Sequence, residues 1–167
     1  MLLMLHLFFW YNTRSKSTLE EVENVANEAS MIIEDGVLKN GRQCEGEVVV
    51  PEGVTEIAEK AFYNNKKLTG LVIPEGVTRI GRFAVSGCRE LKYVQVPDSV
   101  TSMGDQALMR KFESDVGFTH VMENKEHYPE IRCHAGSWID QKMREIKASD
   151  TWADSHGTKH LVEIVNI

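Results

Sequence analysis

The residues best placed to do chemistry lie late in the chain, in the segment CHAGS at residues 133–137. A cysteine ahead of a glycine turn is typical of thiol-based hydrolysis of phosphate esters, in which the thiolate is the nucleophile. That chemistry needs an arginine to hold the anion where Ile139 stands, and Arg132 rather than a histidine precedes Cys133. We therefore expect a structural role, with a strand ending at Cys133 and a helix capped by Ser137.

A metal-dependent hydrolase is the second chemical possibility, because histidines cluster in the same part of the chain. These are His120, His127, His134, His156 and His160. The spacing of His156 and His160 suits zinc, and Cys133 with His134 offers further ligands. Gly157 lies between the first two and disfavours a rigid helix that presents both. We expect solvent-facing histidines, no metal and no cofactor.

The composition of the chain narrows the classes of function further. The chain has 167 residues, of which 42% are hydrophobic and 26% charged, and its formal charge is −6. An acidic chain is a poor partner for a phosphate backbone, so nucleic-acid binding is not expected. No phosphate-binding loop, dinucleotide fingerprint, zinc-protease motif or nucleophile elbow occurs. Three cysteines form no disulfide framework. We expect no enzyme.

The elements that must position these residues begin with an apolar leader, residues 1–16. Its apolar run is shorter than the roughly 20 residues that cross a bilayer, so we expect no integral membrane span. Basic residues follow the run rather than precede it, which disfavours a secretory signal. We expect the leader to dock on the body of the protein or on a neighbour.

Residues 17–45 predict a helix and a hairpin that cap the N-terminal end. Ser17 and Thr18 with the glutamates that follow can form a capping box. The spacing of Leu19, Val22, Ala26 and Ala29 predicts the apolar face of the helix, and Asn27 belongs to the polar face. An Asp-Gly pair between two short apolar runs then predicts a tight hairpin turn, which needs positive φ at both positions.

A repeat of 23 residues is the most informative feature of the chain. The phrases VVVPEGV, LVIPEGV and VQVPDSV recur, each followed by Thr-x-Ile or Thr-x-Met. Apolar residues alternate before each proline and predict a short strand with one buried face. The proline ends that strand because it cannot donate to the ladder. One unit cannot bury its apolar side alone, but stacked units can.

These phrases resemble the BspA-like bacterial leucine-rich repeats. The unit VTRIGRFAVSGCRELKYVQVPDS is similar to that family's pattern nearly throughout, with Asn65 and Cys88 at its Asn/Cys position. The resemblance covers residues 31–108 well and 131–147 loosely. It implies an α/β leucine-rich-repeat solenoid: β-rich right-handed coils of 23 residues with short helical turns. It also implies an N-terminal helix and hairpin cap and a C-terminal helix and strand cap. Surface adhesion and host-protein binding are among the family's functions. The resemblance is compatible with a protein in the cytoplasm and with one that is secreted or displayed on the bacterial surface.

The pattern decays after Ala107, where Lys111 and Ser114 occupy the positions that the repeat phase assigns to Asn/Cys and Leu. We therefore expect about three coils in residues 46–122, the last degenerate, and a C-terminal cap in residues 123–167. In the cap, Ile139, Met143 and Ile146 predict the buried face of a helix over 138–147. A last strand is expected over 161–165.

The remaining candidate site is the outward face of the repeat strands. The 23-residue phase places Glu47, Gly70 and Tyr93 in one row, and Val49, Val72 and Gln95 in the next. Repeat proteins bind partners on such surfaces, and an aromatic residue such as Tyr93 is a good anchor. The main hypothesis is a non-enzymatic module that binds a protein or peptide through Glu47, Val49, Val72, Tyr93 and Gln95, with a possible adhesion role. The alternatives are a self-associating structural protein and, less favoured, the thiol or metal hydrolase.

Overall fold

The computed structural model describes residues 24–108, 129–148 and 163–167, which form two five-stranded sheets and two helical segments. The leader over residues 1–16 and the degenerate coil expected after residue 108 lie outside the described residues. The elements are β1 (Ile32–Glu34), β2 (Val37–Asn40), β3 (Gly46–Val49), β4 (Glu56–Ile57), β5 (Leu68–Val72), β6 (Arg79–Ile80), β7 (Tyr93–Gln95), β8 (Ser102–Met103), β9 (Glu130–Cys133), α2 (Trp138–Ala148) and β10 (Ile164–Asn166).

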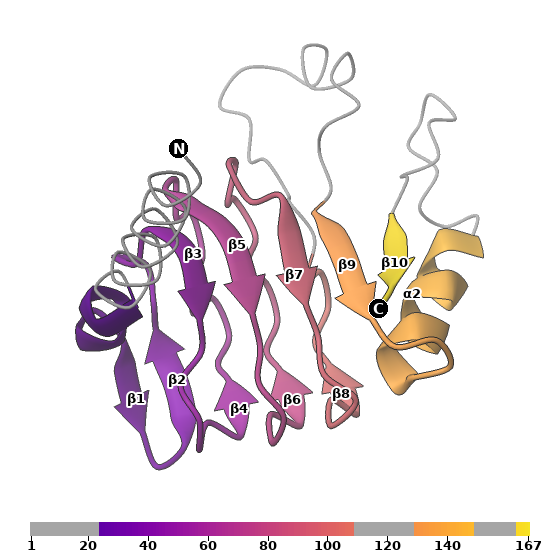
Figure 1. Ribbon diagram of the computed structural model, residues 1–167, viewed down its shortest axis with the longest axis horizontal. Coiled ribbons are helices and arrows are strands. Elements are labelled where there is room, and N and C mark those ends of the chain that lie inside the picture. The colour runs from indigo at the N-terminus through magenta and orange to yellow at the C-terminus, as the bar shows by residue number, and fades with distance from the viewer. Residues whose placement is uncertain (1–23, 109–128, 149–162) are drawn as a thin grey trace, which may run out of the picture.

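Each repeat unit contributes one strand to each sheet. The long-strand sheet has the order β3-β5-β7-β9-β10, and all of its neighbouring pairs are parallel. The short-strand sheet has the order β1-β2-β4-β6-β8, in which only the β1–β2 pair is antiparallel. Equivalent strands of successive units therefore lie side by side (Figure 1).

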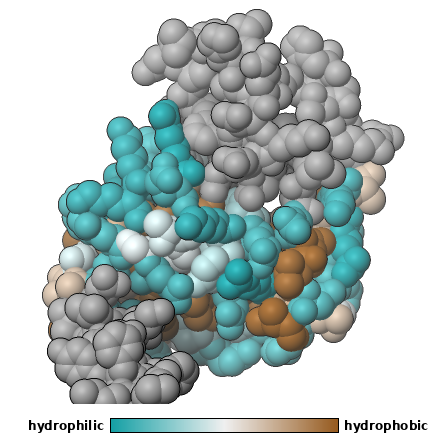
Figure 2. Space-filling model, turned by 45° about the horizontal axis from the view of Figure 1, so that its top comes forward, coloured by the Kyte–Doolittle hydropathy of each residue, from teal (hydrophilic) through white to brown (hydrophobic). Residues whose placement is uncertain are grey.

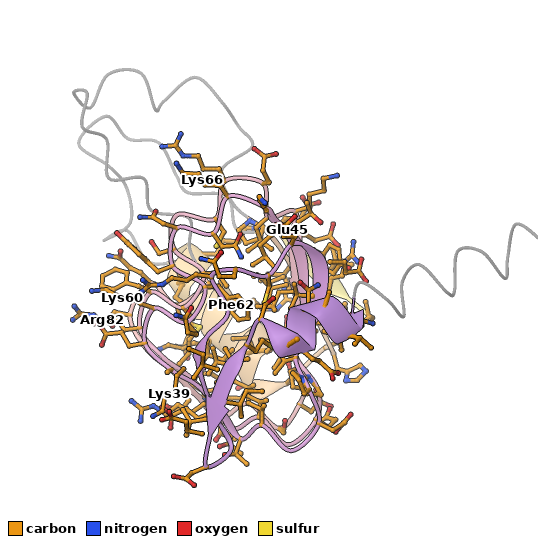
Figure 3. The ribbon with its side chains drawn as sticks, turned by 90° about the vertical axis from the view of Figure 1, so that its left-hand side faces the viewer. Lys39, Glu45, Lys60, Phe62, Lys66 and Arg82 are labelled. Atoms are coloured by element: carbon orange, nitrogen blue, oxygen red, sulfur yellow. The ribbon has the colours of Figure 1, made fainter. Side chains whose placement is uncertain are left out.

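The core lies between the two sheets. Val48, Leu71 and Val94 from the long strands face Ile57 and Ile80 from the short ones, and all five are buried. Viewed along the stack, successive units superimpose, with Phe62 in the interior and the charged side chains labelled in Figure 3 on the outside. Hydrophilic residues cover most of the described surface on the side shown in Figure 2. The alternation of apolar and polar residues in the repeat therefore correctly predicts which side chains face the core and which face solvent.

The third side of each unit is a turn and not the short helical turn that the sequence predicted. Residues 59–64, 82–87 and 105–108 are turns. Lys60, Phe83 and Gln106, which share one repeat phase, all have φ between 54° and 60°. A residue with positive φ interrupts a right-handed helix. Alternate backbone N–H groups instead bond the next unit, as from Phe62 to the carbonyl of Ala84 at 2.8 Å.

The N-terminal hairpin forms as predicted, but the helix before it docks by a different face. Asp35 and Gly36 have φ of 49° and 74° and join β1 to β2. In the helical residues 24–29, Ala26 and Ala29 are exposed and Asn27 is buried, so the predicted apolar face was wrong at these positions. The predicted capping box at residues 17–18 and the first residues of that face, Leu19 and Val22, lie outside the described residues. The reason is a hydrogen-bonded contact: the Asn27 carboxamide bonds the backbone at the start of β3.

The C-terminal helix agrees with its prediction, and the last strand agrees with its prediction in part. In α2, Ile139 and Met143 are buried and Ile146 packs against the core. The last strand is β10, Ile164–Asn166, which shares residues 164 and 165 with the prediction, whereas residues 161 and 162 lie outside the described part of the chain. The register of β10 is set by parallel pairing with β9, in which Ile164 lies opposite Ile131. The apolar residues around 161–165 do not by themselves show where this pairing begins and ends.

Candidate functional site

The outward residues of the long-strand sheet form two rows, of which the first crosses four strands and the second all five. The strand register places Glu47, Gly70, Tyr93 and Glu130 opposite one another in the first row. It places Val49, Val72, Gln95, Arg132 and Val165 in the second. The first three members of each row are those that the 23-residue spacing predicted. Whether they bind a partner remains a prediction.

The valines of the second row form its apolar part. Val49 is 37% exposed, and Val72 and Val165 are half-buried. Gln95, on β7, is also half-buried and separates Val72 from Arg132 in the row. Partly exposed apolar side chains in one row, with polar neighbours on either side, resemble on a small scale the apolar centre and polar rim of a protein–protein interface.

Tyr93 is held against the sheet and does not project freely. A Cβ atom added at Gly70 would lie 2.8 Å from the Cε1 and Cζ atoms of Tyr93, so the ring occupies the space that glycine leaves open. The Arg132 guanidinium carbon lies 3.8 Å from the ring centroid. Burial, together with the hydrogen bond and charge of Glu47, raises the pKa of Tyr93 to about 12, and the Arg132 charge opposes the shift. The aromatic is therefore preorganised.

Arg132 and Glu130 on β9 belong to this surface, and sequence reasoning missed them. Nε of Arg132 donates to the Glu130 carboxylate, and this hydrogen bond raises the pKa of the guanidinium. The strand around Ile131 was expected, but only as part of a cap. The signal was present: Glu-Ile-Arg-Cys alternates polar and apolar residues as Tyr93–Val96 does. An insertion before β9 breaks the 23-residue phase and hides the match.

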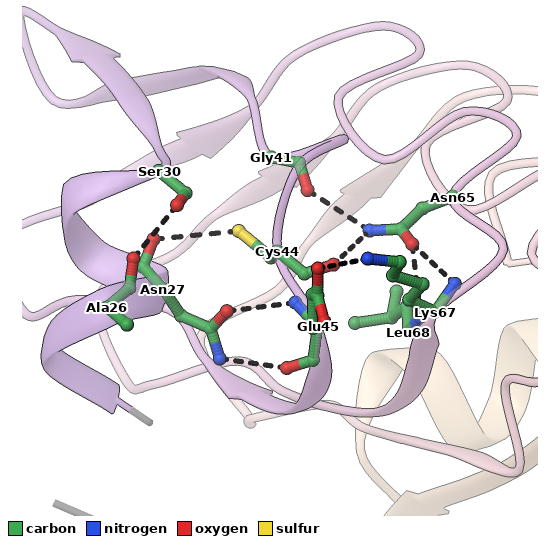
Figure 4. Close-up of polar contacts among 9 residues, drawn as sticks. All are labelled: Ala26, Asn27, Ser30, Gly41, Cys44, Glu45, Asn65, Lys67 and Leu68. Carbon is green, nitrogen blue, oxygen red and sulfur yellow. Dashed lines mark hydrogen bonds and ion pairs between the residues drawn. The ribbon is translucent and has the colours of Figure 1, made fainter. Parts of the chain in front are cut away.

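Buried polar side chains inside the units fix the backbone that carries these rows (Figure 4). Nδ2 of Asn65 donates to the carbonyls of Gly41 and Cys44, at 3.3 and 2.8 Å. Its Oδ1 accepts the N–H groups of Lys67 and Leu68, at 2.9 and 3.0 Å. Since a buried backbone group without a partner is costly, this one side chain holds the turn that leads into β5.

Asn27 makes the equivalent contacts at the N-terminal end of the stack. Its Oδ1 accepts the N–H of Glu45 at 2.9 Å, and its Nδ2 donates to the Glu45 carbonyl at 3.0 Å. The Cys44 thiol donates to the Asn27 carbonyl at 3.6 Å. The helix therefore satisfies the polar backbone of the first unit, in which Arg42 stands at the position that the repeat phase assigns to Asn65 and Cys88.

The thiol chemistry considered from the sequence has little support in this geometry. Cys133 is buried, and burial raises the pKa of its thiol. A nucleophilic cysteine needs the opposite, an accessible group with a lowered pKa. His134 is directed to another partner, with Nδ1 3.0 Å from Oδ2 of Asp98. His120, His127, His156 and His160 lie outside the described residues, and the described part contains no cluster of three metal-ligating side chains.

Parallel strands repeated at one spacing, with a polar side chain inside each turn and an outward strand face, define a short leucine-rich-repeat array. The family model for the BspA type leucine rich repeat region (6 copies) matches residues 31–121, so the chain belongs to that family. No curated protein and no solved structure was found to match the chain. Leucine-rich repeats generally mediate protein–protein interactions and are typically non-enzymatic. No helix in the part of the chain described here is long and apolar enough to cross a membrane.

Proposed function

We propose that this protein is a non-enzymatic interaction module that binds a protein or peptide on the outward face of its long-strand sheet. The proposal includes a short solenoid in which the N-terminal helix and hairpin, and the C-terminal helix and last strand, act as caps. The observation that carries it is the preorganised Tyr93, held over Gly70 and under Arg132, with the partly exposed Val49 and Val72 in the neighbouring row. A fixed aromatic loses little conformational entropy when a partner binds.

Affinity capture from the native source tests this function with full-length protein and two substitutions. Tyr93→Ala removes the aromatic side chain. Val72→Asp places a charge in the second outward row, which we call the valine row because Val49, Val72 and Val165 belong to it. The matched control is Val37→Asp, which changes a half-buried valine on the short-strand sheet. We expect capture to be lost in both strand-face variants and kept in the control. Capture that survives both variants, or that falls equally in the control, contradicts the proposal.

Self-association is a second candidate, favoured by one observation at the opposite end of the stack. Ile32 and Ile33 on the edge strand β1 are 51% and 38% exposed. Unpaired edge strands with apolar side chains can pair between chains. Light scattering of full-length protein against Ile32→Lys/Ile33→Lys tests it. A dimer mass that falls to that of a monomer supports self-association, and an unchanged mass contradicts it at this edge.

A further inference from the structure

The first outward row of the long-strand sheet carries carboxylates at both of its ends. Glu47 and Glu130 lie at two of its positions. By the register that pairs Ile164 with Ile131, the exposed Glu163 lies opposite Glu130 and extends this row. The members between them are Gly70 and Tyr93, which carry no positive charge. We call these residues the acidic row.

A second line of carboxylates follows the strands on the other side of the valines. Glu52, Glu75 and Asp98 occupy one repeat phase in the turns that leave the long-strand sheet, and all three are exposed. The Glu75 carboxylate accepts the backbone N–H groups of Asp98 and Ser99, both at 3.2 Å, so this line is fixed to the stack. The valine row therefore runs between two lines of carboxylates.

Arg132 is the one cation in the two outward rows, and it is already engaged. It donates to Glu130 and stacks on the ring of Tyr93. Glu47 faces the hydroxyl of Tyr93, and its hydrogen bond and negative charge contribute, after burial, to raising the pKa of that hydroxyl to about 12. His134, beside the rows, is paired with Asp98. Over the two outward rows and the second line of carboxylates, negative side chains therefore outnumber positive ones.

We infer that the partner recognised by the strand face is a basic protein segment in which lysine or arginine side chains alternate with apolar ones. This inference rests on the proposed function and adds the chemistry of the partner. The apolar side chains pack on Val49 and Val72, and the cations face the acidic row and the second line of carboxylates. Charge complementarity of this kind selects partners and raises the rate of association.

A pair of synthetic peptides tests the sign of the charge. The probes are fluorescein-labelled Lys-Val-Lys-Val-Lys-Val-Lys and its counterpart with Glu in place of Lys. Anisotropy is measured with full-length protein at low and at physiological salt. We expect the basic peptide to bind, more weakly as salt rises, and the acidic one not to bind. Equal binding of both peptides, or no binding of the basic one, overturns the inference.

Charge-neutralising variants locate the site. Glu47→Gln/Glu130→Gln keeps the hydrogen-bonding shape and removes two charges from the acidic row. Glu34→Gln/Glu59→Gln removes two exposed charges elsewhere and is the matched control. We expect binding of the basic peptide to weaken about tenfold in the first variant, as for two partly exposed ion pairs, and to stay unchanged in the control. An equal loss in both variants overturns the inference, because net charge alone then explains the binding.

The apolar contribution and the proposed function are separated by two further measurements. Val72→Ser is expected to weaken binding of the Lys-Val peptide but not of a Lys-Gly peptide, and an equal effect on both overturns the inference. Capture of a native partner that depends on Tyr93 without any preference for the basic peptide overturns the inference alone. Capture that survives both Tyr93→Ala and Val72→Asp overturns the proposed function itself.

Discussion

At the scale of single residues, the outward side chains are placed by their neighbours as much as by their own rotamers. Tyr93 can lie against the sheet because the residue opposite it in the neighbouring strand is Gly70. Arg132 reaches diagonally from the next row to cover the ring. Diagonal cross-strand contacts of this kind are within reach of long side chains. The 23-residue spacing predicted the row to which Tyr93 belongs. It did not predict that Tyr93 is half-buried, because that depends on the space left by Gly70.

Gly70→Ala is predicted to displace the Tyr93 ring. The new Cβ would lie 2.8 Å from two ring carbons, and the ring can give way because it is a side chain rather than backbone. We expect the Arg132 Nε–H resonance to lose its ring-current shift, with melting temperature little changed. Tyr93→Leu gives the reference spectrum without a ring. A shift that persists in Gly70→Ala means that the stacking does not depend on the glycine.

Asn65→Ala is predicted to be among the most destabilising single changes in the repeat. It leaves the carbonyls of Gly41 and Cys44 and the N–H groups of Lys67 and Leu68 without their buried partner. Unsatisfied buried groups carry a large desolvation cost, so we expect a loss of about 3 kcal/mol in the free energy of unfolding. Urea denaturation measures it, with the exposed neighbour Lys66→Ala as control. Similar losses in both variants contradict the assigned role.

At the scale of the elements, close packing between neighbouring turns depends on glycine. A Cβ at Gly81 would lie 2.4 Å from the Glu59 nitrogen and 2.5 Å from the Ala58 carbonyl carbon. Gly104, in the same phase of the next unit, meets the Arg82 nitrogen at 2.5 Å. These atoms belong to backbone that is itself hydrogen-bonded between units, so it cannot move away as a side chain can.

Gly81→Ala is therefore predicted to cost about 3 kcal/mol or more, at the upper end of overpacking effects. The control is Gly53→Ala, because Gly53 has a φ of 87° but no atom within 4 Å of an added Cβ. That control is expected to cost about 1 kcal/mol, from backbone strain alone. Thermal and urea unfolding of both proteins decide the matter, and equal losses would show that the neighbouring turn yields.

The C-terminal helix begins with two side-chain caps, one of which couples its stability to pH. Ser137 Oγ accepts the N–H of Asp140 at 3.2 Å, and the Asp140 carboxylate accepts the N–H of Gly136 at 2.9 Å. Arg144 donates to the same carboxylate at 2.8 Å, and this bond, followed by that from Gly136, lowers the pKa of Asp140. A lowered pKa in the folded state means that the ionised carboxylate stabilises the fold.

Asp140→Asn is predicted to lower the melting temperature at neutral pH. The contribution of Asp140 is fully present above the pKa of an unfolded aspartate, about 3.9, and is lost as pH falls through the lower folded value. The difference in melting temperature between wild type and variant should therefore shrink as pH is lowered below about 4. Exposed Glu145→Gln is the control. A difference that stays constant with pH would mean that the charge of Asp140 contributes nothing.

At the scale of the whole molecule, the repeat spacing predicted more than the local patterns did. Since each unit aligns with its neighbours, the phase that matches Glu47 with Gly70 and Tyr93 also determines the sheet register. The N-terminal and C-terminal ends of the array do not follow the 23-residue spacing. Asn27 could not be predicted as a buried residue because its partners lie in the backbone at Glu45, and a helical periodicity does not show them.

The same reasoning explains which half of the candidate site was predicted. Glu47, Val49, Val72, Tyr93 and Gln95 could be placed in rows because they lie within the uninterrupted repeat. Glu130 and Arg132 join the rows only through pairing of β9 with β7, after an insertion of unpredictable length. A periodic pattern has no means to count such an insertion, although the local alternation around Ile131 was readable.

The equivalent contacts between successive units also bear on how the number of repeat units changes during evolution. Equivalent backbone bonds join each unit to the next, as from Thr78 to the carbonyl of Thr55 and from Thr101 to that of Thr78. A duplicated unit therefore meets the same neighbours as the original did. Inserting a second copy of residues 54–76 after Gly76 should give a folded, cooperatively melting chain, and an insoluble or non-cooperative product would contradict this. Each such event widens both outward rows by one strand, about 4.8 Å, so gene duplication can lengthen the recognised epitope without redesigning either end.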